Sequence, residues 1–403
     1  MVVRVFLSLV WVRKTMASCI SLLSLFSMMV LFVLEERVCI PSCEVFSMNP
    51  EDLRVMMVSD LLLRGSEAGF MDVYFRDFYM AKFFRKSFEK LKPDMLVVLG
   101  DVSAKGSELP NNKWLSVLQQ LQRVLGPLFE LPLHIVVGER DIGDCSNLDS
   151  DHVSQVCSSL PGLNSCGCGA FSVSNISFLS LNSIPMLCNK NNLRFGVEKF
   201  IEKESLELRV GEKSINEEAS ESKEWTKRLH EREIAVKYGS GPVLLLHFPL
   251  HRRTGSTCKC IETPERNYWD KFPHDNPSAS ENFEIFGSGA HKVLCTIPPN
   301  ASEYILQALG PRIVFSAHTH EFCDCTHVDG TREVTIPSMT WVVTDHPGFV
   351  LATFGNNEEA VRLSHCSLAR ELYISSIHAS VLTLLICMSL FALRPLHRSL
   401  SAR

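Results

Sequence analysis

The chain has 403 residues, enough for one large hydrophobic core or two smaller ones. Its formal net charge is −5 and its Lys and Arg residues form no dense cluster, so the composition gives no reason to expect a nucleic-acid partner. Fifteen cysteines and an uncharged segment near each end argue instead against a soluble cytosolic enzyme.

Residues 15–34 are uncharged and mostly apolar, and their number meets the roughly 20 residues that a membrane-spanning helix needs. A cleavable signal peptide would have a shorter apolar core followed by a small-residue cleavage site, and neither is evident. We therefore predict an uncleaved transmembrane helix here, with a cleaved signal peptide as the alternative.

Apolar runs and amphipathic stretches alternate through the body of the chain, which predicts an α/β fold. We expect strands over 55–59, 96–99, 133–137, 176–181, 243–246 and 312–315, and helices over 71–90 and 114–125. The first helix carries an aromatic stripe at helical spacing, which we interpret as core packing. The stripe consists of Phe75, Phe78, Tyr79, Phe83, Phe84 and Phe88.

Two segments of the body depart from this alternation. Residues 198–237 are dense in Glu, Lys, Arg and Ser, which predicts a solvated helix or a mobile insertion without a chemical role. Residues 255–291 are rich in Cys, Pro, Asn and Gly and predict a long loop of the kind that forms lids or binding loops.

A second transmembrane helix is predicted over 373–393, which carries no charged side chain apart from His378. Basic residues lie outside both spans, so the positive-inside rule places residues 1–14 and 394–403 in the cytoplasm. The domain between the spans, residues 35–372, would then face the lumen of the endoplasmic reticulum or Golgi.

Sequons and cysteines agree with a lumenal domain. Asn175-Ile-Ser and Asn300-Ala-Ser are N-glycosylation sequons, which are used only in the lumen. Thirteen of the 15 cysteines lie in the domain, which favours disulfides. Three C-x-C pairs are too tight to bridge internally, so we expect each member to pair elsewhere, with a structural zinc site as the alternative. These pairs are Cys166/Cys168, Cys258/Cys260 and Cys323/Cys325.

Carboxylates and imidazoles follow five of the predicted strands. The residues that come after these apolar runs are Asp60, Asp101, Glu139, His247 and the pair His318 and His320. Because side chains at the carboxyl ends of parallel strands meet at one sheet edge, we expect this set to converge on a metal site. Taken singly, Asp101 could cap a helix and His247 could be a hydrogen-bonded core histidine. The ordered set favours the metal site.

Two divalent cations need a bridging carboxylate and several imidazole and oxygen ligands in order to bind a phosphate and stabilise in-line attack at phosphorus. Asp101 is the candidate bridge. Asp60 and His320 would serve one metal, and His247 and His318 would serve the other.

Motifs around these residues resemble those of the calcineurin-like metallophosphoesterase superfamily, and most closely its metallophosphoesterase 1 branch, which remodels GPI anchors. The resemblance covers roughly residues 55–354. The motifs are Gly100-Asp101-Val-Ser-Ala-Lys-Gly106, Leu246-His247-Phe-Pro-Leu-His251-Arg-Arg253, Ser316-Ala-His318-Thr-His320 and Ile336-Pro-Ser-Met-Thr-Trp341.

The resemblance implies an α/β fold, a β-sandwich flanked by helices with one transmembrane helix at each end, and a dinuclear centre at the sheet edge. It also implies a manganese-dependent phosphodiesterase that removes ethanolamine phosphate from the GPI glycan and thereby aids GPI-protein transport. Its substrates would be GPI-anchored proteins or phosphorylated membrane glycans.

Two departures from the family motifs bear on catalysis. The family's D-x-H becomes Asp60-Leu61-Leu62, so the first metal keeps only Asp60, Asp101 and His320. The family's G-N-H-D becomes Gly138-Glu139-Arg140-Asp141, in which Glu139 can still ligate the second metal. Arg140 can hold a phosphate oxygen, but at neutral pH it cannot donate a proton to a leaving group.

His251 is a candidate replacement for the missing acid, with a surface histidine as the simpler interpretation. The neighbouring Arg252-Arg253 pair is expected either to contact an anionic substrate or to be solvated. The departures at Leu62 and Arg140 motivate a second hypothesis, an inactive phosphoesterase fold that binds GPI-proteins or phosphorylated glycans as a cargo adaptor.

Overall fold

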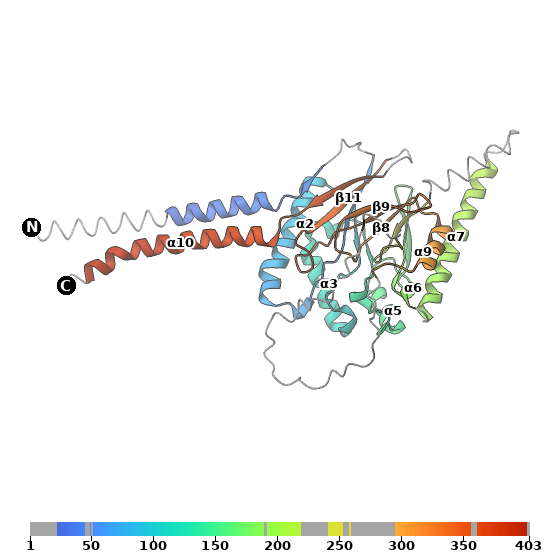
Figure 1. The fold of residues 1–403 in the computed structure, drawn as a ribbon, viewed down its shortest axis with the longest axis horizontal. Coiled ribbons are helices and arrows are strands. Elements are labelled where there is room, and N and C mark those ends of the chain that lie inside the picture. Colours follow the sequence, from blue (N-terminus) through green and yellow to red (C-terminus); the bar gives the residue numbers. More distant parts are fainter. Residues whose placement is uncertain are drawn as a thin grey trace, which may run out of the picture.

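The computed structural model describes residues 22–44, 49, 51–188, 192–218, 241–252, 258, 295–355 and 361–400. Within them, two six-stranded sheets pack face to face and helices cover their outer faces (Figure 1). The predicted α/β sandwich is therefore confirmed.

The first sheet has the strand order β1-β12-β11-β2-β3-β4, and its last three strands run parallel. Its strands are β1 (Ser42–Cys43), β12 (Arg362–Ser367), β11 (Gly348–Phe354), β2 (Leu53–Val58), β3 (Met95–Leu99) and β4 (Leu133–Val136). Helices α2 (Asp77–Leu91) and α3 (Asn111–Leu125) make the crossovers between these parallel strands.

The second sheet has the order β5-β6-β7-β8-β10-β9, with β6, β7, β8 and β10 parallel. Its strands are β5 (Gly169–Val173), β6 (Ile176–Ser180), β7 (Val243–Leu245), β8 (Ile313–Ser316), β10 (Arg332–Thr335) and β9 (Cys323–Thr326). The ligand-bearing strands therefore divide between two sheets, β2, β3 and β4 in one and β7 and β8 in the other.

Alternation along the strands builds two cores. In β2, Val55 and Met57 point into the space between the sheets, whereas Met56 and Val58 point toward the covering helices. This period of two buries both faces of each central strand, which explains why the sequence shows continuous apolar runs.

Short helices and turns complete the domain. They are η1 (Gly65–Glu67), η2 (Asp72–Arg76), η3 (Gly106–Glu108), η4 (Gly126–Glu130), α4 (Glu139–Ile142), α5 (Ser150–Ser158), α6 (Ile184–Leu187) and α9 (Pro299–Leu309).

The predicted helix 71–90 is a π-helical turn, η2, followed by α2. In its aromatic stripe, Tyr79, Phe83 and Phe84 are buried, but Phe78 is 50% exposed. The expectation that the whole stripe packs in the core is wrong at this position.

The charged segment begins inside a long helix, α7 (Asn192–Glu218). Val197 and Ile201 of this helix are fully buried, so its first part packs on the domain and is not solvated on all sides. Residues 219–240 and most of the predicted loop 255–291 lie outside the described residues.

One described helix is long and apolar enough to cross a membrane, namely the part of α10 (Glu371–Leu400) from Glu371 to Leu390. Near the other terminus, residues 22–38 are helical, and this helix lies alongside α10 (Figure 1). Residues 15–21 lie outside the described part, and the N-terminal span stays a prediction.

The disulfides bear out only part of the cysteine expectation. Disulfides join Cys43 to Cys366, Cys145 to Cys188 and Cys258 to Cys323, and the last links two C-x-C pairs. Among the described cysteines, however, Cys166, Cys168 and Cys325 are free, so the expectation that each member pairs elsewhere is wrong for them. The Cys166 thiol instead donates to the Asn164 side chain at 2.9 Å, and the buried Cys168 packs as a small apolar residue.

Candidate metal centre

Sharp backbone turns at the strand ends aim the predicted ligands at one place. Asp60, Asp101, His318 and His320 all have positive φ angles, between 50° and 66°. Such angles are uncommon for residues with a side chain and concentrate at functional sites, where the surrounding structure holds the strain. The turns lie directly after strands of both sheets, so the two sheet edges contribute to a single cluster.

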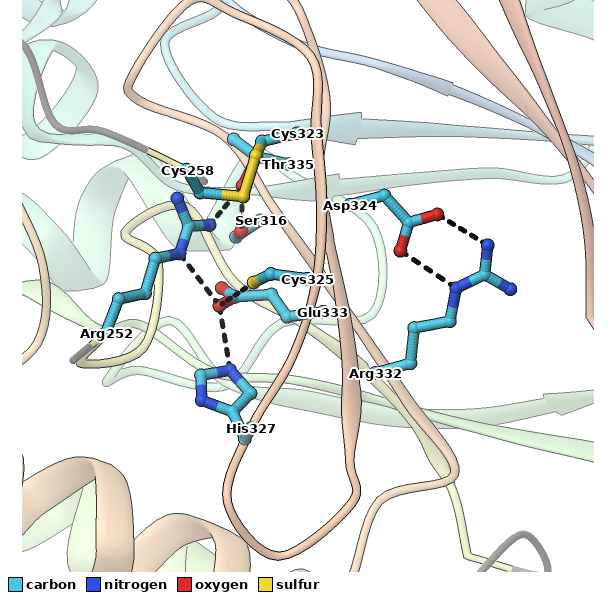
Figure 2. The surroundings of a disulfide bond; sticks show 10 residues. All are labelled: Arg252, Cys258, Ser316, Cys323, Asp324, Cys325, His327, Arg332, Glu333 and Thr335. Atoms are coloured by element: carbon cyan, nitrogen blue, oxygen red, sulfur yellow. Dashed lines mark hydrogen bonds and ion pairs between the residues drawn. A yellow bond between two sulfur atoms is a disulfide. The ribbon is translucent and has the colours of Figure 1, made fainter. Parts of the chain in front are cut away.

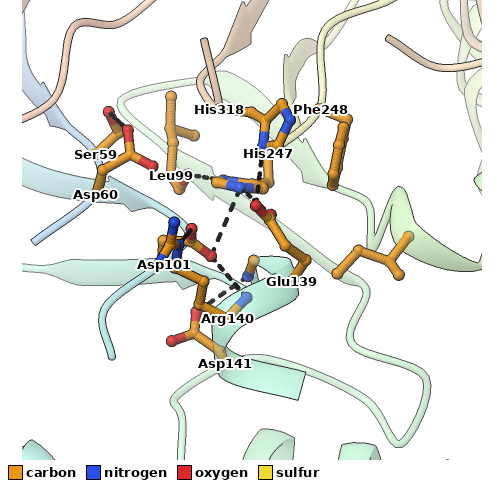
Figure 3. A network of polar contacts seen from close by, with 12 residues as sticks. Ser59, Asp60, Leu99, Asp101, Glu139, Arg140, Asp141, His247, Phe248 and His318 are labelled. Atoms are coloured by element: carbon orange, nitrogen blue, oxygen red, sulfur yellow. Dashed lines mark hydrogen bonds and ion pairs between the residues drawn. The ribbon is translucent and has the colours of Figure 1, made fainter. Parts of the chain in front are cut away.

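Glu139 is the centre of the best-defined contacts (Figure 3). Its Oε2 lies 2.6 Å from His247 Nε2, and its Oε1 lies 3.0 Å from His318 Nδ1. His247 Nε2 also lies 3.6 Å from Asp101 Oδ1. These contacts bring together the four residues predicted to hold the second metal.

Buried charge dominates the electrostatics of this cluster. Burial and the nearby Glu139 carboxylate raise the pKa of Asp101 well above its usual range. Burial also opposes ionisation of Glu139, but His318 and His247 outweigh it and hold the pKa of Glu139 well below its usual range. Closely spaced buried carboxylates repel one another, and a divalent cation relieves this repulsion.

The donor atoms fit a metal ion. Five buried atoms of this cluster face one another at ion-pair distances but make no well-aligned hydrogen bond among the described residues: Asp60 Oδ1, Asp101 Oδ2, Glu139 Oε2, His247 Nε2 and His318 Nδ1. A buried polar atom without a hydrogen bond destabilises the fold. Five such atoms that converge on one point therefore indicate a shared ligand that satisfies them together. Carboxylate oxygens and imidazole nitrogens are the donors that Mn²⁺ and Zn²⁺ accept.

Supporting hydrogen bonds orient the ligands. His247 Nδ1 lies 2.8 Å from the Leu99 carbonyl oxygen, which fixes the ring so that Nε2 faces the cluster. Asp141 accepts hydrogen bonds from the backbone N–H groups of Val102, Ser103 and Gly138. Asp141 thereby ties the turn after β3 to the turn after β4. The sequence signal for this role is the place of Asp141 at the end of the segment Gly138-Glu139-Arg140-Asp141, which corresponds to the family's G-N-H-D.

The first-metal side is less complete. His320 Nε2 lies 3.8 Å from Asp60 Oδ1, and the Ser59 hydroxyl donates to Asp60 Oδ2 at 2.7 Å. Leu62, which stands where the family has an imidazole, is buried in a small apolar cluster with Ala104 and Val342. Asp60 and His320 do lie together as predicted, and the described donors that accompany Asp60 are Asp101 and His247, which the second-metal side also uses.

Arg140 lies within the centre. Its Nε is 3.3 Å from Asp101 Oδ2, and its backbone N–H donates to Asp101 Oδ1 at 3.0 Å. Its side chain is 32% exposed, so it lies at the rim of the cluster.

His251 is not brought to the centre. Its side chain is exposed, and its backbone N–H donates to the Ser302 hydroxyl at 2.8 Å. Among the described contacts, no atom of His251 reaches a predicted ligand, which favours the surface interpretation over a catalytic acid. The turn Phe248-Pro249-Leu250 carries the chain away from His247 before His251 is reached.

Arg252 is not solvated, because it pairs with a buried carboxylate (Figure 2), whereas Arg253 lies outside the described residues. Nε of Arg252 lies 3.4 Å from Oε2 of the buried Glu333, and His327 Nε2 lies 2.9 Å from the same oxygen. Cys325, His327 and Glu333 have metal-ligand spacing, but the guanidinium already supplies the positive charge at this carboxylate. We interpret the group as a structural network beside the Cys258–Cys323 disulfide.

Comparisons with known proteins agree with this geometry. The model of the calcineurin-like phosphoesterase family matches residues 53–322. The Metallophosphoesterase 1 of Danio rerio is 25% identical over 353 residues, which cover 86% of this chain and 83% of the relative. That of Rattus norvegicus is 25% identical over 322 residues, which cover 79% of this chain and 73% of the relative.

Among solved structures, a dimetal phosphatase from Danio rerio is similar with a TM-score of 0.43 and 11% identity, covering 78% of this chain and 96% of that one. The matched residues include strands β2 to β8 and every predicted ligand. The chain belongs to the calcineurin-like phosphoesterase family and is a hydrolase of phosphoester bonds with a divalent-metal centre.

Proposed function

We propose that this protein is a manganese-dependent phosphodiesterase that removes ethanolamine phosphate from the GPI glycan of membrane-held proteins. The observation that carries the metal-dependent reaction is the convergence of five buried donor atoms that make no well-aligned hydrogen bond among the described residues. The similarity to Metallophosphoesterase 1 proteins over most of their length supports the choice of substrate.

The residues of the centre would have two roles, metal binding and phosphate binding. A divalent metal held by Asp101, Glu139, His247 and His318 would supply Lewis-acid activation of the phosphoester and of water. Arg140 would bind a non-bridging phosphate oxygen, because only its Nε contacts Asp101 and its two terminal nitrogens have no recorded partner among the described residues. Its guanidinium keeps its charge at any physiological pH, so it positions and neutralises phosphate without transferring a proton.

The surface around the start of α10 supports a substrate held in the bilayer. Figure 1 shows α2 lying across the base of α10 and of the helix at 22–38. Contacts between Arg76 and Glu371 and between Tyr79 and His378 fix α2 to α10. On the exposed side of η2 and α2, four apolar side chains are 50–73% exposed: Phe70, Met71, Tyr74 and Phe78.

Such an apolar and aromatic face, continuous with a membrane span, suits the headgroup region of a bilayer. We place the domain on the lumenal side of endoplasmic reticulum or Golgi membranes. Both sequon asparagines, Asn175 and Asn300, are exposed and thus accessible to glycosylation.

The test uses the full chain purified in detergent with Mn²⁺ and a GPI glycan that carries ethanolamine phosphate. Mass spectrometry should show loss of the ethanolamine phosphate group with the wild type and no loss with Asp101→Asn. If the wild type leaves the glycan intact but still hydrolyses a simple phosphodiester, the GPI substrate is wrong and the phosphodiesterase is retained. If the wild type binds the glycan without cleaving any ester, the adaptor hypothesis replaces catalysis.

A further inference from the structure

We propose that the centre holds a single divalent metal ion, and that the guanidinium of Arg140 provides the positive charge on the side where Asp60 and His320 lie. The inference shares with the proposed function only the need for a metal at this site. It does not depend on the substrate.

The protein donors are distributed unequally between the two predicted positions. Glu139, His247 and His318 each offer an atom within 4.8 Å of the others. On the first-metal side, the group with this spacing consists of Asp60, Asp101 and His247, and two of these, Asp101 and His247, also belong to the second-metal set. Asp60 is the one member of this group that the second-metal side does not use. His320 contacts Asp60 at 3.8 Å but does not lie within 4.8 Å of the whole group.

Apolar packing occupies the place of the missing ligand. Leu62 is 5% exposed and packs with Ala104, which is 5% exposed, and Val342, which is 8% exposed. These side chains offer no donor atom, and an ion beside them would lose hydration without gaining a ligand. The cluster therefore disfavours an ion at the first-metal position, beside Asp60 and His320.

Arg140 provides a cation at the carboxylate of Asp101, which both predicted positions share. Its Nε faces Asp101 Oδ2 at 3.3 Å, and this oxygen is one of the buried atoms without a hydrogen bond. Oδ1 of the same carboxylate faces His247 at 3.6 Å. One oxygen of Asp101 thus faces the second-metal side, with Glu139, His247 and His318, and the other faces the guanidinium. A carboxylate shared between a metal and an arginine would have this orientation.

Charge balance leads to the same stoichiometry. Three carboxylates face the centre with an oxygen that lacks a hydrogen bond, those of Asp60, Asp101 and Glu139. The fourth carboxylate, Asp141, is satisfied by three backbone N–H groups. One divalent ion and one guanidinium match the three charges. A second divalent ion would add two positive charges, which further anionic ligands such as hydroxide or phosphate would have to balance.

The test counts metal ions in the full chain purified in detergent, equilibrated with Mn²⁺ and passed through a desalting column. Elemental analysis should give close to one Mn²⁺ per chain, and electron paramagnetic resonance should show the spectrum of an isolated ion. Two ions per chain with a spin-coupled spectrum would overturn the inference and leave the proposed function standing. A folded chain that binds no Mn²⁺ would overturn both.

Paired double variants test the role of Arg140 itself. Leu62→His with Arg140→Met restores the missing imidazole and removes the cation, so the count should rise from one ion to two. Leu62→His with Arg140→Lys keeps a positive charge of similar length and should stay at one. A count of one in the Met variant, with an unchanged melting temperature, would overturn the role assigned to Arg140. Equal counts of two in both variants would do so as well.

Discussion

At the scale of single residues, close packing at the ligand turns determines the geometry of the centre. A Cβ atom at Gly138 would lie 2.1 Å from Asp101 Oδ1 and 2.5 Å from the Asp101 backbone nitrogen. The φ angle of Gly138 is −110°, which any residue can adopt, so the space around it alone requires glycine.

We expect Gly138→Ala to displace Asp101 and to lower kcat/KM for a phosphodiester about 100-fold, since shifts of about 1 Å have effects of that size. Metal content, measured in parallel, should fall with activity. The matched control is Gly355→Ala, where the nearest atom to a new Cβ is 3.6 Å away. Wild-type activity in Gly138→Ala would show that Asp101 does not need its present position.

A second residue-scale prediction concerns pH. Burial between the two sheets lowers the pKa of His134 from 6.5 to about 4, and its Nε2 lies 2.8 Å from the Ser180 hydroxyl. A depressed histidine pKa means that the unfolded chain binds the proton more tightly. His134 therefore costs no stability above about pH 6.5, and stability falls as the pH drops from there toward 4.

The full effect of that shift is at most about 3 kcal/mol, from the usual value of 1.36 kcal/mol per pKa unit. The variant His134→Gln keeps a hydrogen-bonding side chain but cannot titrate. Thermal unfolding of the full chain should show a smaller loss of melting temperature between pH 6.5 and 4.5 in the variant than in the wild type. Equal losses would show that His134 does not contribute to acid sensitivity.

At the scale of elements, α2 combines a buried face and an exposed apolar face. Tyr79 and Phe84 pack into the core, while Tyr74 of η2 is 68% exposed and Phe78 is 50% exposed. If this exposed face lies in the headgroup region, a tryptophan introduced there should be quenched by bromine-labelled lipid.

We expect quenching of the added fluorescence in Tyr74→Trp, measured in the full chain reconstituted into vesicles and compared with the wild type. The control is Phe195→Trp, because Phe195 is equally apolar and 70% exposed but belongs to α7, at the far side of the domain from α10 (Figure 1). Equal quenching at both positions, or none at Tyr74, would contradict the membrane-facing orientation of α2.

The elements that could be predicted from the sequence are those governed by local patterns. Apolar runs gave β2, β3, β7 and β8 to within about two residues, and helical spacing gave α3. The exposure of Phe78 could not be predicted. Helical periodicity shows that an apolar stripe exists, but not how much of its width a neighbouring element covers. The division of the ligand strands between two sheets depends on long-range pairing, and no local pattern contains it.

At the scale of the whole molecule, the convergence of the candidate ligands could be predicted, because each one follows a strand and strand ends of a sandwich meet at an edge. The environments of Arg140 and Arg252 could not. Arg252 is buried against Glu333, which lies far along the chain, and Arg140 lies beside Asp101 only once β3 and β4 are paired. Charge partners of this kind are decided by tertiary contacts.

Covalent and ionic contacts attach both ends of the domain to its body. The disulfide between Cys43 and Cys366 joins β1 to β12, immediately inside the helix at 22–38 and α10. Glu35 and Glu36 accept ion pairs from Lys82, which connects the first of these helices to α2. Both ends of the domain are thus fastened on the side from which the two long helices leave.

The central claim is that the chain is a divalent-metal phosphoesterase whose chemistry depends on the cluster around Asp101 and Glu139. The most direct measurement is hydrolysis of a chromogenic phosphodiester by the purified full chain, before and after chelation and after Mn²⁺ is restored. We predict activity that disappears with chelation, returns with Mn²⁺ and is absent from Asp101→Asn under all conditions. Activity that survives complete metal removal, or that Asp101→Asn retains at the wild-type level, would contradict the claim.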